Sequence, residues 1–275
     1  MAALISRFSP HESGAPPILI DSLTVRFNGT LALDNLELEI PPGARVAVVG
    51  PNGAGKTTLL KVIAGVLSPS EGKVSIFGAG PHGHVCIAYV PQRSQVDWTF
   101  PVTVQEVVMM GRIRKLGAFR WPHRSDWEIV SHALEQVAML DYRDHPIGEL
   151  SGGQQQRVFL AQALAQEAEI VLLDEPLSGL DLPSQEAILK LLEGLRPLGI
   201  TVLIATHDLK LAAERFDLVM LLNRRLLAFG KPKQALSQEA LLAAYGGHLH
   251  VVVDESGPIL LTDTCCDGDE EEKHG

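Results

Sequence analysis

Several features that would place this chain in a membrane or among secreted, disulfide-linked proteins are absent. No uninterrupted apolar stretch approaches the roughly 18 residues that a membrane-spanning helix needs. The N-terminus has no basic start followed by a long apolar run, so we expect no secretory signal. The three cysteines, Cys86, Cys265 and Cys266, offer no disulfide framework. These absences favour a cytoplasmic protein in a reducing compartment.

Aromatic residues are also scarce, at 5% of the chain, although 46% of its 275 residues are hydrophobic. The expected core is therefore mostly aliphatic, which suits parallel strands covered by helices on both faces. The length allows one large α/β domain with a smaller lobe or a tail.

An excess of positive charge is lacking as well. The formal net charge is −10, and the last 22 residues, from Asp254 to Gly275, contribute −7 of it through eight acidic residues and one lysine. Proteins that bind nucleic acid carry the opposite balance, so we expect no nucleic-acid partner.

The pattern of apolar and turn residues predicts three parts. Residues 1–17 form a flexible leader, residues 18–247 a compact domain, and residues 248–275 an extension that ends in the acidic tail. Two antiparallel strands are expected first, at residues 18–27 and 32–40, around an Asn28-Gly29 turn. Further strands are expected at residues 45–49, 74–77, 85–90, 170–173, 201–205, 217–223 and 225–229, and helices at residues 56–66, 103–111, 125–140, 153–166, 183–195 and 238–245.

A glycine-rich loop lies between the expected strand at residues 45–49 and the expected helix at residues 56–66. It reads Gly-Pro-Asn-Gly-Ala-Gly-Lys-Thr and fits the phosphate-loop pattern of Gly, four residues, Gly-Lys-Ser/Thr. Glycines let backbone N–H groups curl around phosphate oxygens, and the helix start adds the positive end of its dipole. A chance glycine-rich turn is the alternative, which the flanking strand and helix disfavour. The predicted ATP contacts are Gly50, Pro51, Asn52, Gly53, Ala54, Gly55, Lys56, Thr57 and Thr58.

Polar side chains follow three other expected strands. Asp174 and Glu175 end the strand at residues 170–173, where Asp174 can hold Mg²⁺ together with Thr57 and Glu175 can take a proton from an attacking water. His207 ends a second strand and can contact the γ-phosphate, and Gln92 follows a third and can contact Mg²⁺ or water through its amide oxygen. Taken alone, such strand-end residues are more often structural, but beside a phosphate loop they become candidate catalytic and metal-binding groups.

A second anion site is predicted at residues 150–157, Leu-Ser-Gly-Gly-Gln-Gln-Gln-Arg. Ser151, Gly152, Gly153 and Gln154 open the helix expected at residues 153–166, so the chain has two phosphate-binding helix starts. This segment resembles the signature of the ATP-binding cassette family, Leu-Ser-Gly-Gly-Gln. The order of motifs also resembles that family: phosphate loop, Gln92, signature, Asp174-Glu175, Ser178-Gly179-Leu180-Asp181 and His207.

The resemblance implies a P-loop NTPase fold of the α/β class, with a RecA-like core, an antiparallel β subdomain and an α-helical subdomain at about residues 93–165. It implies an ATPase in which Phe27 stacks on the adenine. Two copies meet head to tail, so that ATP on the phosphate loop of one is covered by the Ser151 segment of the other, with Asp181 at the dimer contact. Glu175 then acts as the base in hydrolysis.

Within that family the sequence is similar to the group that imports manganese, zinc or iron. The similarity rests on residues 96–104, Met110-Gly111-Arg112, Phe216-Asp217, residues 221–224 and residues 244–247. It implies integral membrane permease subunits and an extracytoplasmic metal-binding protein as partners, with this chain peripheral on the cytoplasmic face of the cell membrane. The alternatives are an importer ATPase for another cargo, such as chelated iron, or a soluble cassette ATPase without a transport role.

The segment between Gln92 and Ser151 holds all three tryptophans and several arginines. Such a mixture indicates a protein interface, and packing inside a small helical lobe is an equal alternative. The residues are Trp98, Phe100, Arg112, Arg114, Lys115, Phe119, Arg120, Trp121, Arg124 and Trp127.

Two groups of histidine and cysteine could bind a soft metal ion, although incidental placement is the favoured explanation for both. One is His82, His84 and Cys86; the other is His248, His250, Cys265, Cys266 and His274.

Overall fold

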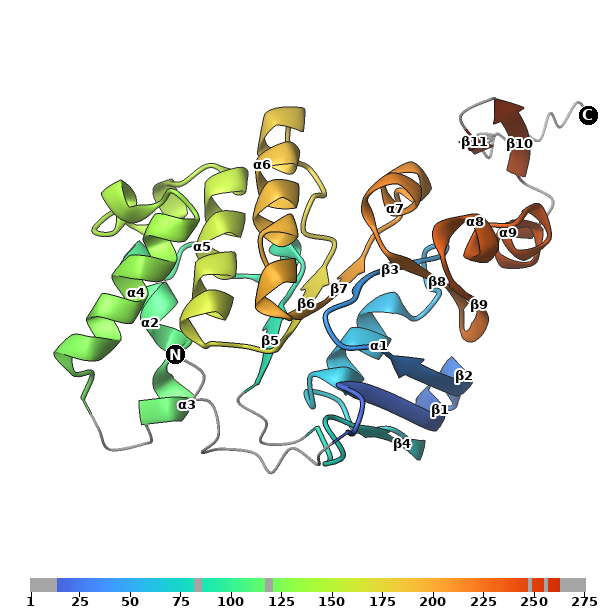
Figure 1. Cartoon of the computed structure of the whole chain (residues 1–275), viewed down its shortest axis with the longest axis horizontal. Coiled ribbons are helices and arrows are strands. Elements are labelled where there is room, and N and C mark those ends of the chain that lie inside the picture. Colours follow the sequence, from blue (N-terminus) through green and yellow to red (C-terminus); the bar gives the residue numbers. More distant parts are fainter. Residues whose placement is uncertain (1–13, 82–85, 117–120, 247–248, 255–256, 263–275) are drawn as a thin grey trace, which may run out of the picture.

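The computed structural model describes residues 14–81, 86–116, 121–246, 249–254 and 257–262, with the backbone alone described beyond residue 246. In these residues the chain forms a six-stranded sheet, a three-stranded antiparallel sheet and a two-stranded hairpin (Figure 1). None of the helices in these ranges is both long and apolar enough to cross a lipid bilayer.

The six-stranded sheet forms the centre of the molecule. Its order is β5 (Ile87–Val90), β6 (Ile170–Asp174), β7 (Thr201–Ala205), β3 (Arg45–Val49), β8 (Leu218–Asn223) and β9 (Arg225–Gly230). Neighbouring strands are parallel except at the β8–β9 edge. Successive residues of each parallel strand point to opposite faces, and both faces are apolar. The sheet is therefore covered on both sides.

Two hydrophobic clusters lie on the two faces of this sheet. Val46, Val48 and Leu172 pack into one cluster, and Ala47, Val49 and Leu173 pack into the other. The first cluster is completed by helix α1 (Lys56–Ile63) and by the antiparallel sheet of β2 (Thr30–Ile40), β1 (Ile18–Phe27) and β4 (Glu71–Ser75). The second is completed by helices from the other side, chiefly α2 (Val104–Met110), α4 (Arg124–Gln136), α5 (Gly152–Ala165) and α6 (Leu182–Glu193).

Helices α2, α4 and α5, with the short α3 (Ile113–Leu116), form a lobe inserted between β5 and β6. Figure 1 shows this lobe at one end of the molecule and the antiparallel sheet at the other. Of the other helices, α8 (Pro232–Ala235) and α9 (Gln238–Tyr245) lie near β8 and β9, and α7 (Leu209–Arg215) lies near β3 and α8. The hairpin of β10 (Leu249–Asp254) and β11 (Gly257–Thr262) follows α9 and was not expected from the sequence.

The expected strands at residues 18–27, 45–49 and 201–205 and the expected helix at residues 238–245 are confirmed. The expected helix at residues 125–140 ends too late, because Ala138 has a positive φ of 54° and a separate turn forms at Leu140–Tyr142. The strand expected at residues 74–77 lies at Glu71–Ser75 instead. Phe77, with a φ of 48°, is in the left-handed region and cannot continue a strand.

The tryptophans of the lobe separate into two kinds. Trp98 packs its ring against Phe159 of α5, with centroids 5.5 Å apart in an edge-to-face arrangement. Trp121, in contrast, is 88% exposed, and Trp127 and Phe100 are also exposed. Packing therefore accounts for Trp98, whereas Trp121, Trp127 and Phe100 form exposed apolar surface. Phe119 and Arg120 lie outside the described residues.

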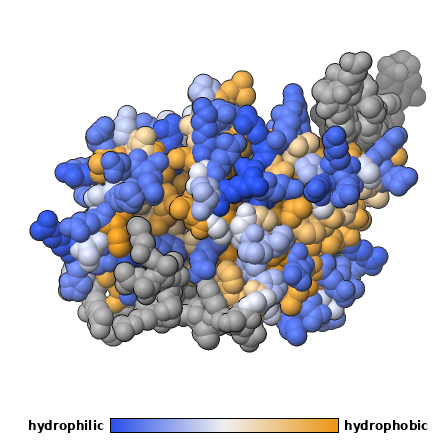
Figure 2. Space-filling model, viewed as in Figure 1, coloured by the Kyte–Doolittle hydropathy of each residue, from blue (hydrophilic) through white to orange (hydrophobic). Residues whose placement is uncertain are grey.

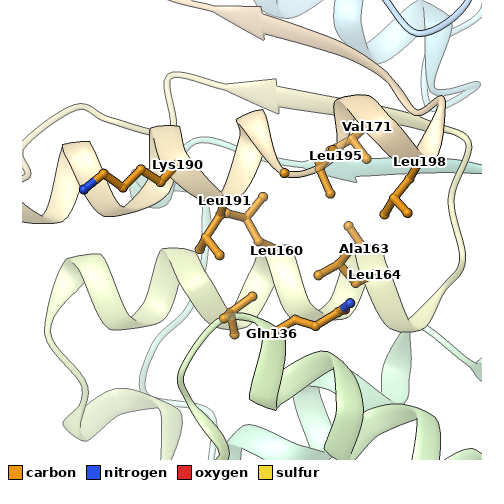
Figure 3. A pocket seen from close by; sticks show the side chains of 11 residues that line it. Gln136, Leu160, Ala163, Leu164, Val171, Lys190, Leu191, Leu195 and Leu198 are labelled. Carbon is orange, nitrogen blue, oxygen red and sulfur yellow. The ribbon is translucent and has the colours of Figure 1, made fainter.

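A small cavity of about 230 Å³ lies where α4, α5 and α6 meet (Figure 3). Its lining is largely aliphatic, from residues such as Leu160, Leu164, Leu191 and Leu195, and it contains none of the predicted site residues. Figure 3 shows the Lys190 side chain extending away from the cavity. An aliphatic lining cannot bind a triphosphate, so this cavity is a gap in the packing between the lobe and α6.

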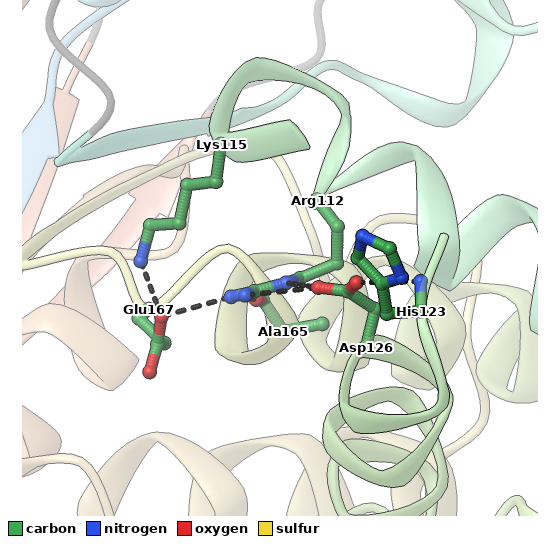
Figure 4. A network of polar contacts seen from close by, with 6 residues as sticks. All are labelled: Arg112, Lys115, His123, Asp126, Ala165 and Glu167. Atoms are coloured by element: carbon green, nitrogen blue, oxygen red, sulfur yellow. Dashed lines mark hydrogen bonds and ion pairs between the residues drawn. The ribbon is translucent and has the colours of Figure 1, made fainter. Parts of the chain in front are cut away.

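Arg112, which the sequence suggested as an interface residue, is instead only 8% exposed and lies inside the lobe (Figure 4). Its guanidinium donates to Asp126 Oδ1 from Nε (3.3 Å) and Nη2 (3.2 Å), and Nη1 donates to the carbonyl of Ala165 (3.0 Å). Nη1 also pairs with Glu167 at 2.8 Å, and Lys115 pairs with the same carboxylate. Since Asp126 accepts from the N–H of His123 at the start of α4, this network joins α4 to the end of α5.

We expect Arg112→Ala to lower the free energy of unfolding by about 3–5 kcal/mol, because Asp126 would remain buried without its counter-charge. Urea denaturation followed by circular dichroism measures this loss. Arg124→Ala is the matched control, since Arg124 is exposed and, among the described residues, its ion pair is with Glu128 on the same helix face. A loss of less than about 1 kcal/mol for Arg112→Ala would show that the network does not stabilise the lobe.

Candidate functional site

The glycine-rich loop joins β3 to α1, and two of its glycines, Gly50 and Gly55, are required by close approaches of neighbouring strands. A Cβ on Gly50 would lie 1.9 Å from the carbonyl oxygen of Leu222 in β8. A Cβ on Gly55, whose φ is 96°, would lie 2.5 Å from a methyl carbon of Leu33 in β2. These approaches press the loop between two strands and fix its path.

Helix α1 begins at Lys56 with Gly55 as its N-cap and without a side-chain cap. Its first turn contains no acidic residue, and the first N–H groups of any helix have no partner within that helix. The start of α1 therefore presents backbone donors and the positive end of the helix dipole, which is an environment for anions.

Lys56 is 7% exposed, and its ammonium lies within the loop. Nζ donates to the carbonyls of Gly50 at 2.7 Å and Pro51 at 3.0 Å. Burial lowers the pKa of Lys56, and the nearby carboxylates of Glu175 and Asp174 oppose that shift. The loop thus holds a cation at the place where the sequence predicted the phosphates.

Thr57 and Asp174 are brought together from distant parts of the sequence. Thr57 Oγ1 donates to Asp174 Oδ1 at 3.1 Å, and Tyr89 lies 3.5 Å from the other carboxylate oxygen. Burial raises the pKa of Asp174 above its ordinary value, because the charged carboxylate is removed from water. Tyr89 was not predicted as a site residue.

Glu175 and Gln92 are also brought together. Gln92 Nε2 and Ser178 Oγ both donate to Glu175 Oε2, each at 3.1 Å. Glu175 has a positive φ of 48°, and its N–H donates to the carbonyl of Ala205 in the neighbouring strand β7. The carboxylate is therefore held by two donors on one oxygen. The contribution of Ser178 was missed from the sequence, although its spacing of three residues from Glu175 would form one turn.

His207 follows β7, which lies between β6 and β3 in the sheet. It is exposed, and its neighbours Thr206 and Asp208 fix the local backbone: the N–H of Thr206 donates to the carbonyl of Val48, and Asp208 caps α7. The strand order places His207 between the phosphate loop and Asp174-Glu175. Within the described residues no hydrogen bond or ion pair links its side chain to either.

Phe27 ends β1 and is 46% exposed, so one aromatic face is accessible. It pairs with Thr30 across the tight turn that the sequence predicted at Asn28-Gly29. The position is suited to stacking on a planar base.

The signature segment (residues 151–154) opens α5. Ser151 Oγ accepts from the N–H of Gln154, and the Gln154 side chain accepts from the N–H of Ser151, which forms a capping box. A Cβ on Gly153 would lie 2.6 Å from Ser184 Oγ at the start of α6, which Asp181 caps. None of the hydrogen bonds and ion pairs in the described part of the chain joins this segment to the phosphate loop. In the described residues the second anion site is thus not linked to the first one by a hydrogen bond or ion pair.

The sequence also offered candidate metal ligands outside this site. Cys86 is buried, and burial raises the pKa of its thiol to about 12, which disfavours the thiolate that would bind a metal. His82, His84, His248, Cys265, Cys266 and His274 lie outside the described residues, as does the side chain of His250. No group of three or more His, Cys, Asp or Glu side chains within the described ranges is placed to hold a metal ion.

Known proteins similar to this chain include ATP-binding proteins of metal transport systems. The chain is 45% identical to a manganese transport system ATP-binding protein of Synechocystis sp. over 251 residues, which cover 90% of this chain and 94% of that protein. It is 44% identical to a zinc transport system ATP-binding protein of Treponema pallidum over 233 residues, covering 84% of this chain and 88% of that protein.

Solved structures share the fold. One, described as a metal-chelate type ABC transporter in an inward-facing conformation, matches with a TM-score of 0.77 at 27% identity and covers 90% of this chain and 98% of that one. An ATP-binding cassette in its ADP conformation matches with a TM-score of 0.73 at 25% identity, over 84% and 98% of the two chains. The sequence profile of the ABC transporter family matches residues 33–178, more than half of the chain. The chain therefore belongs to the ABC transporter family and is one of its ATPase subunits.

Proposed function

We propose that this chain hydrolyses Mg²⁺-bound ATP to power the import of divalent manganese, zinc or iron through partner permease subunits. The observation that carries the ATPase role is the convergence of Lys56, the Thr57–Asp174 pair and the Glu175–Gln92 pair at one edge of the parallel sheet. The cargo is proposed from the relatives, which are named as manganese and zinc transport proteins, with a chelated iron transport protein of Yersinia pestis at 44% identity.

The side chains at this edge fit a magnesium ion. Thr57 Oγ1 and Asp174 Oδ1 lie 3.1 Å apart, and the hydrogen bond from Gln92 Nε2 leaves the amide oxygen of Gln92 available. Hydroxyl, carboxylate and amide oxygens are the ligands that Mg²⁺ prefers, and a nearby cation would favour the charged form of the buried Asp174 carboxylate. When bound, Mg²⁺ neutralises charge on the β- and γ-phosphates.

In the proposed mechanism the nucleotide is held by residues 50–58. Backbone N–H groups of the loop and of the start of α1 surround the phosphates, Lys56 neutralises their charge, and Phe27 stacks on the adenine. The Glu175 oxygen that is not held by Gln92 and Ser178 accepts a proton from the attacking water. His207 contacts the γ-phosphate from the end of β7.

We propose that the active unit is a homodimer. Ser151, Gly152, Gly153 and Gln154 form an anion site at a helix start, and no hydrogen bond or ion pair of the described residues joins this site to the chain's own phosphate loop. A second copy arranged head to tail places it over the partner's ATP, with Asp181, at the exposed start of α6, close to the contact between subunits.

The permease subunits are the remaining partners. Large apolar side chains are exposed on the lobe at Phe100, Met110, Ile113, Trp121 and Trp127. In the view of Figure 2, hydrophilic residues cover most of the outline of the molecule and hydrophobic residues gather nearer its middle. We assign the lobe, at about residues 93–165 of a domain spanning residues 18–247, to contact with the permease. The subunit is then peripheral on the cytoplasmic face of the cell membrane, and an extracytoplasmic protein delivers the metal.

We expect Ser178→Ala to lower kcat for ATP about three- to tenfold with little change in KM, because Glu175 loses one of two donors that orient it. Ser178→Thr keeps the hydroxyl and should retain the parent rate. Steady-state ATPase assays measure both, with Ser131→Ala on the outer face of α4 as the control. Equal kcat for Ser178→Ala and the parent would contradict this role of Ser178.

We expect Glu175→Gln to lower kcat by at least about a hundredfold while ATP binding persists, since an amide cannot take the proton. The variant should accumulate as an ATP-dependent dimer in size-exclusion chromatography. Lys56→Ala should instead lose nucleotide binding, measured with a fluorescent ATP analogue. A Glu175→Gln variant that hydrolyses ATP at the parent rate would falsify the base assignment.

The transport role is tested in cells that lack this gene. We expect uptake of manganese, zinc or iron, measured by elemental mass spectrometry, to fall and to recover with the parent chain but not with Glu175→Gln. The chain should also co-purify with a multi-span permease from membranes. Unchanged uptake of all three metals would reject the proposed cargo, and the absence of a permease would favour a cassette ATPase without a transport role.

A further inference from the structure

Arg93 directly follows Gln92 and links this loop to α5. It begins a short turn, Arg93–Gln95, and its Nε donates to Gln155 Oε1 at 3.0 Å. Its guanidinium lies over the ring of Trp98, with 5.8 Å from Cζ to the centroid. Trp98 Nε1 in turn donates to the carbonyl of Arg93 at 3.0 Å. The Arg93 side chain and backbone are thus both held.

Gln155, which accepts the hydrogen bond from Arg93, is held in place by its surroundings, since it is only 2% exposed. Its Nε2 donates to the carbonyl of Ile147 at 3.1 Å, so both ends of its amide are engaged. Its N–H donates to the carbonyl of Ser151 at 2.9 Å, as the first-turn bond of α5. A residue that fixes Gln155 therefore fixes Ser151, one helical turn away.

Arg93 also lies against the signature segment itself. A Cβ on Gly152 would lie 2.9 Å from Nη1 of Arg93 and 3.1 Å from its Cζ. Further along α5, Trp98 packs on Phe159, about one turn beyond Gln155. The loop after Gln92 therefore contacts α5 at three places: a signature glycine, Gln155 and Phe159.

At its other end the same loop reaches the catalytic carboxylate. Gln92 Nε2 donates to Glu175 Oε2, and the next residue donates to Gln155. Two adjacent residues thus connect the nucleotide site of this chain to the segment proposed to cover the nucleotide of the other chain.

We propose that Arg93 is a positioning residue that sets the Ser151 segment for the partner's ATP, with Trp98 holding Arg93 in place. This inference rests on the proposed head-to-tail dimer. Arg93 touches neither nucleotide; it acts through Gln155 and Gly152. A charge-assisted hydrogen bond to a buried amide, together with the stacking on Trp98, fixes both the rotation and the distance of the helix start.

The test uses heterodimers in which one subunit carries Glu175→Gln, so that only the other subunit hydrolyses ATP. In the first arrangement, Arg93→Ala is placed in the Glu175→Gln subunit, whose Ser151 segment covers the working site. In the second, Arg93→Ala is placed in the subunit with the intact Glu175. ATPase activity is measured at saturating ATP and at a protein concentration that saturates dimer formation.

We expect the first arrangement to lose activity about tenfold or more and the second to stay within about twofold of the parent. Trp98→Phe keeps the ring packed on Phe159 but removes the N–H donor, so it should show the same asymmetry to a smaller extent. Arg124→Ala, an exposed arginine of the same lobe, should leave both arrangements unchanged.

Equal losses in the two arrangements, a larger loss in the second, or no loss in either would overturn the role of Arg93. Failure of the proposed function has a different signature. A dimer with Glu175→Gln in both subunits would then keep its ATPase activity, or the parent chain would not dimerise with ATP.

Discussion

The parallel pairing of β6, β7 and β3 is the constraint on which the site depends. Its register sets Asp174 opposite Ala205, and Ala205 opposite Val48, so three strands end at one edge of the sheet. The phosphate loop, Asp174-Glu175 and His207 each follow one of these strands. Because parallel strands need crossover connections, residues more than a hundred positions apart in the sequence become neighbours at this edge. The apolar clusters on the two faces hold the register.

The buried charged groups at this edge of the sheet are unfavourable for the protein alone and favourable for binding a charged ligand. Lys56 and Asp174 are both buried, and burial lowers the pKa of Lys56 and raises the pKa of Asp174, which favours the neutral form of each. Each also lies near groups of the opposite charge. A buried ammonium and a buried carboxylate cost desolvation energy that such contacts offset only in part. A phosphate beside Lys56 and a cation beside Asp174 would restore favourable interactions for both charges. The same arrangement therefore weakens the protein and would strengthen its affinity for the proposed magnesium nucleotide.

The motifs of the proposed site were readable in the sequence, because each is local: the phosphate loop, the signature segment and the strand-end residues depend on nearest neighbours and strand context. It predicted the central strands for the same reason, since both faces are apolar. The contacts between these motifs could not be predicted from the sequence. The hydrogen bonds from Gln92 and Ser178 to Glu175 depend on a left-handed backbone at Glu175, which residue type does not reveal. The sequence left open whether Arg112 lies at an interface or inside the lobe, because its partners Asp126 and Glu167 lie 14 and 55 residues away.

The helical lobe combines polar contacts among its own helices with a boundary to α6 that is not fully packed. Inside it, the buried Arg112 pairs with Asp126 of α4 and donates to the carbonyl of Ala165 at the end of α5, so one side chain joins the two helices. At its boundary with α6 the packing leaves a cavity of about 230 Å³, whereas the loop at Gln92 and Arg93 makes specific polar contacts on both sides. A lobe joined in this way can change its orientation without losing its internal contacts, because interfaces rearrange more readily than packed cores. On the proposed role of Arg93, the contacts at the Gln92–Arg93 connection would make the orientation of the signature segment depend on the state of Glu175. The residues that transmit that dependence need not touch ATP, which is why no nucleotide-binding motif contains them.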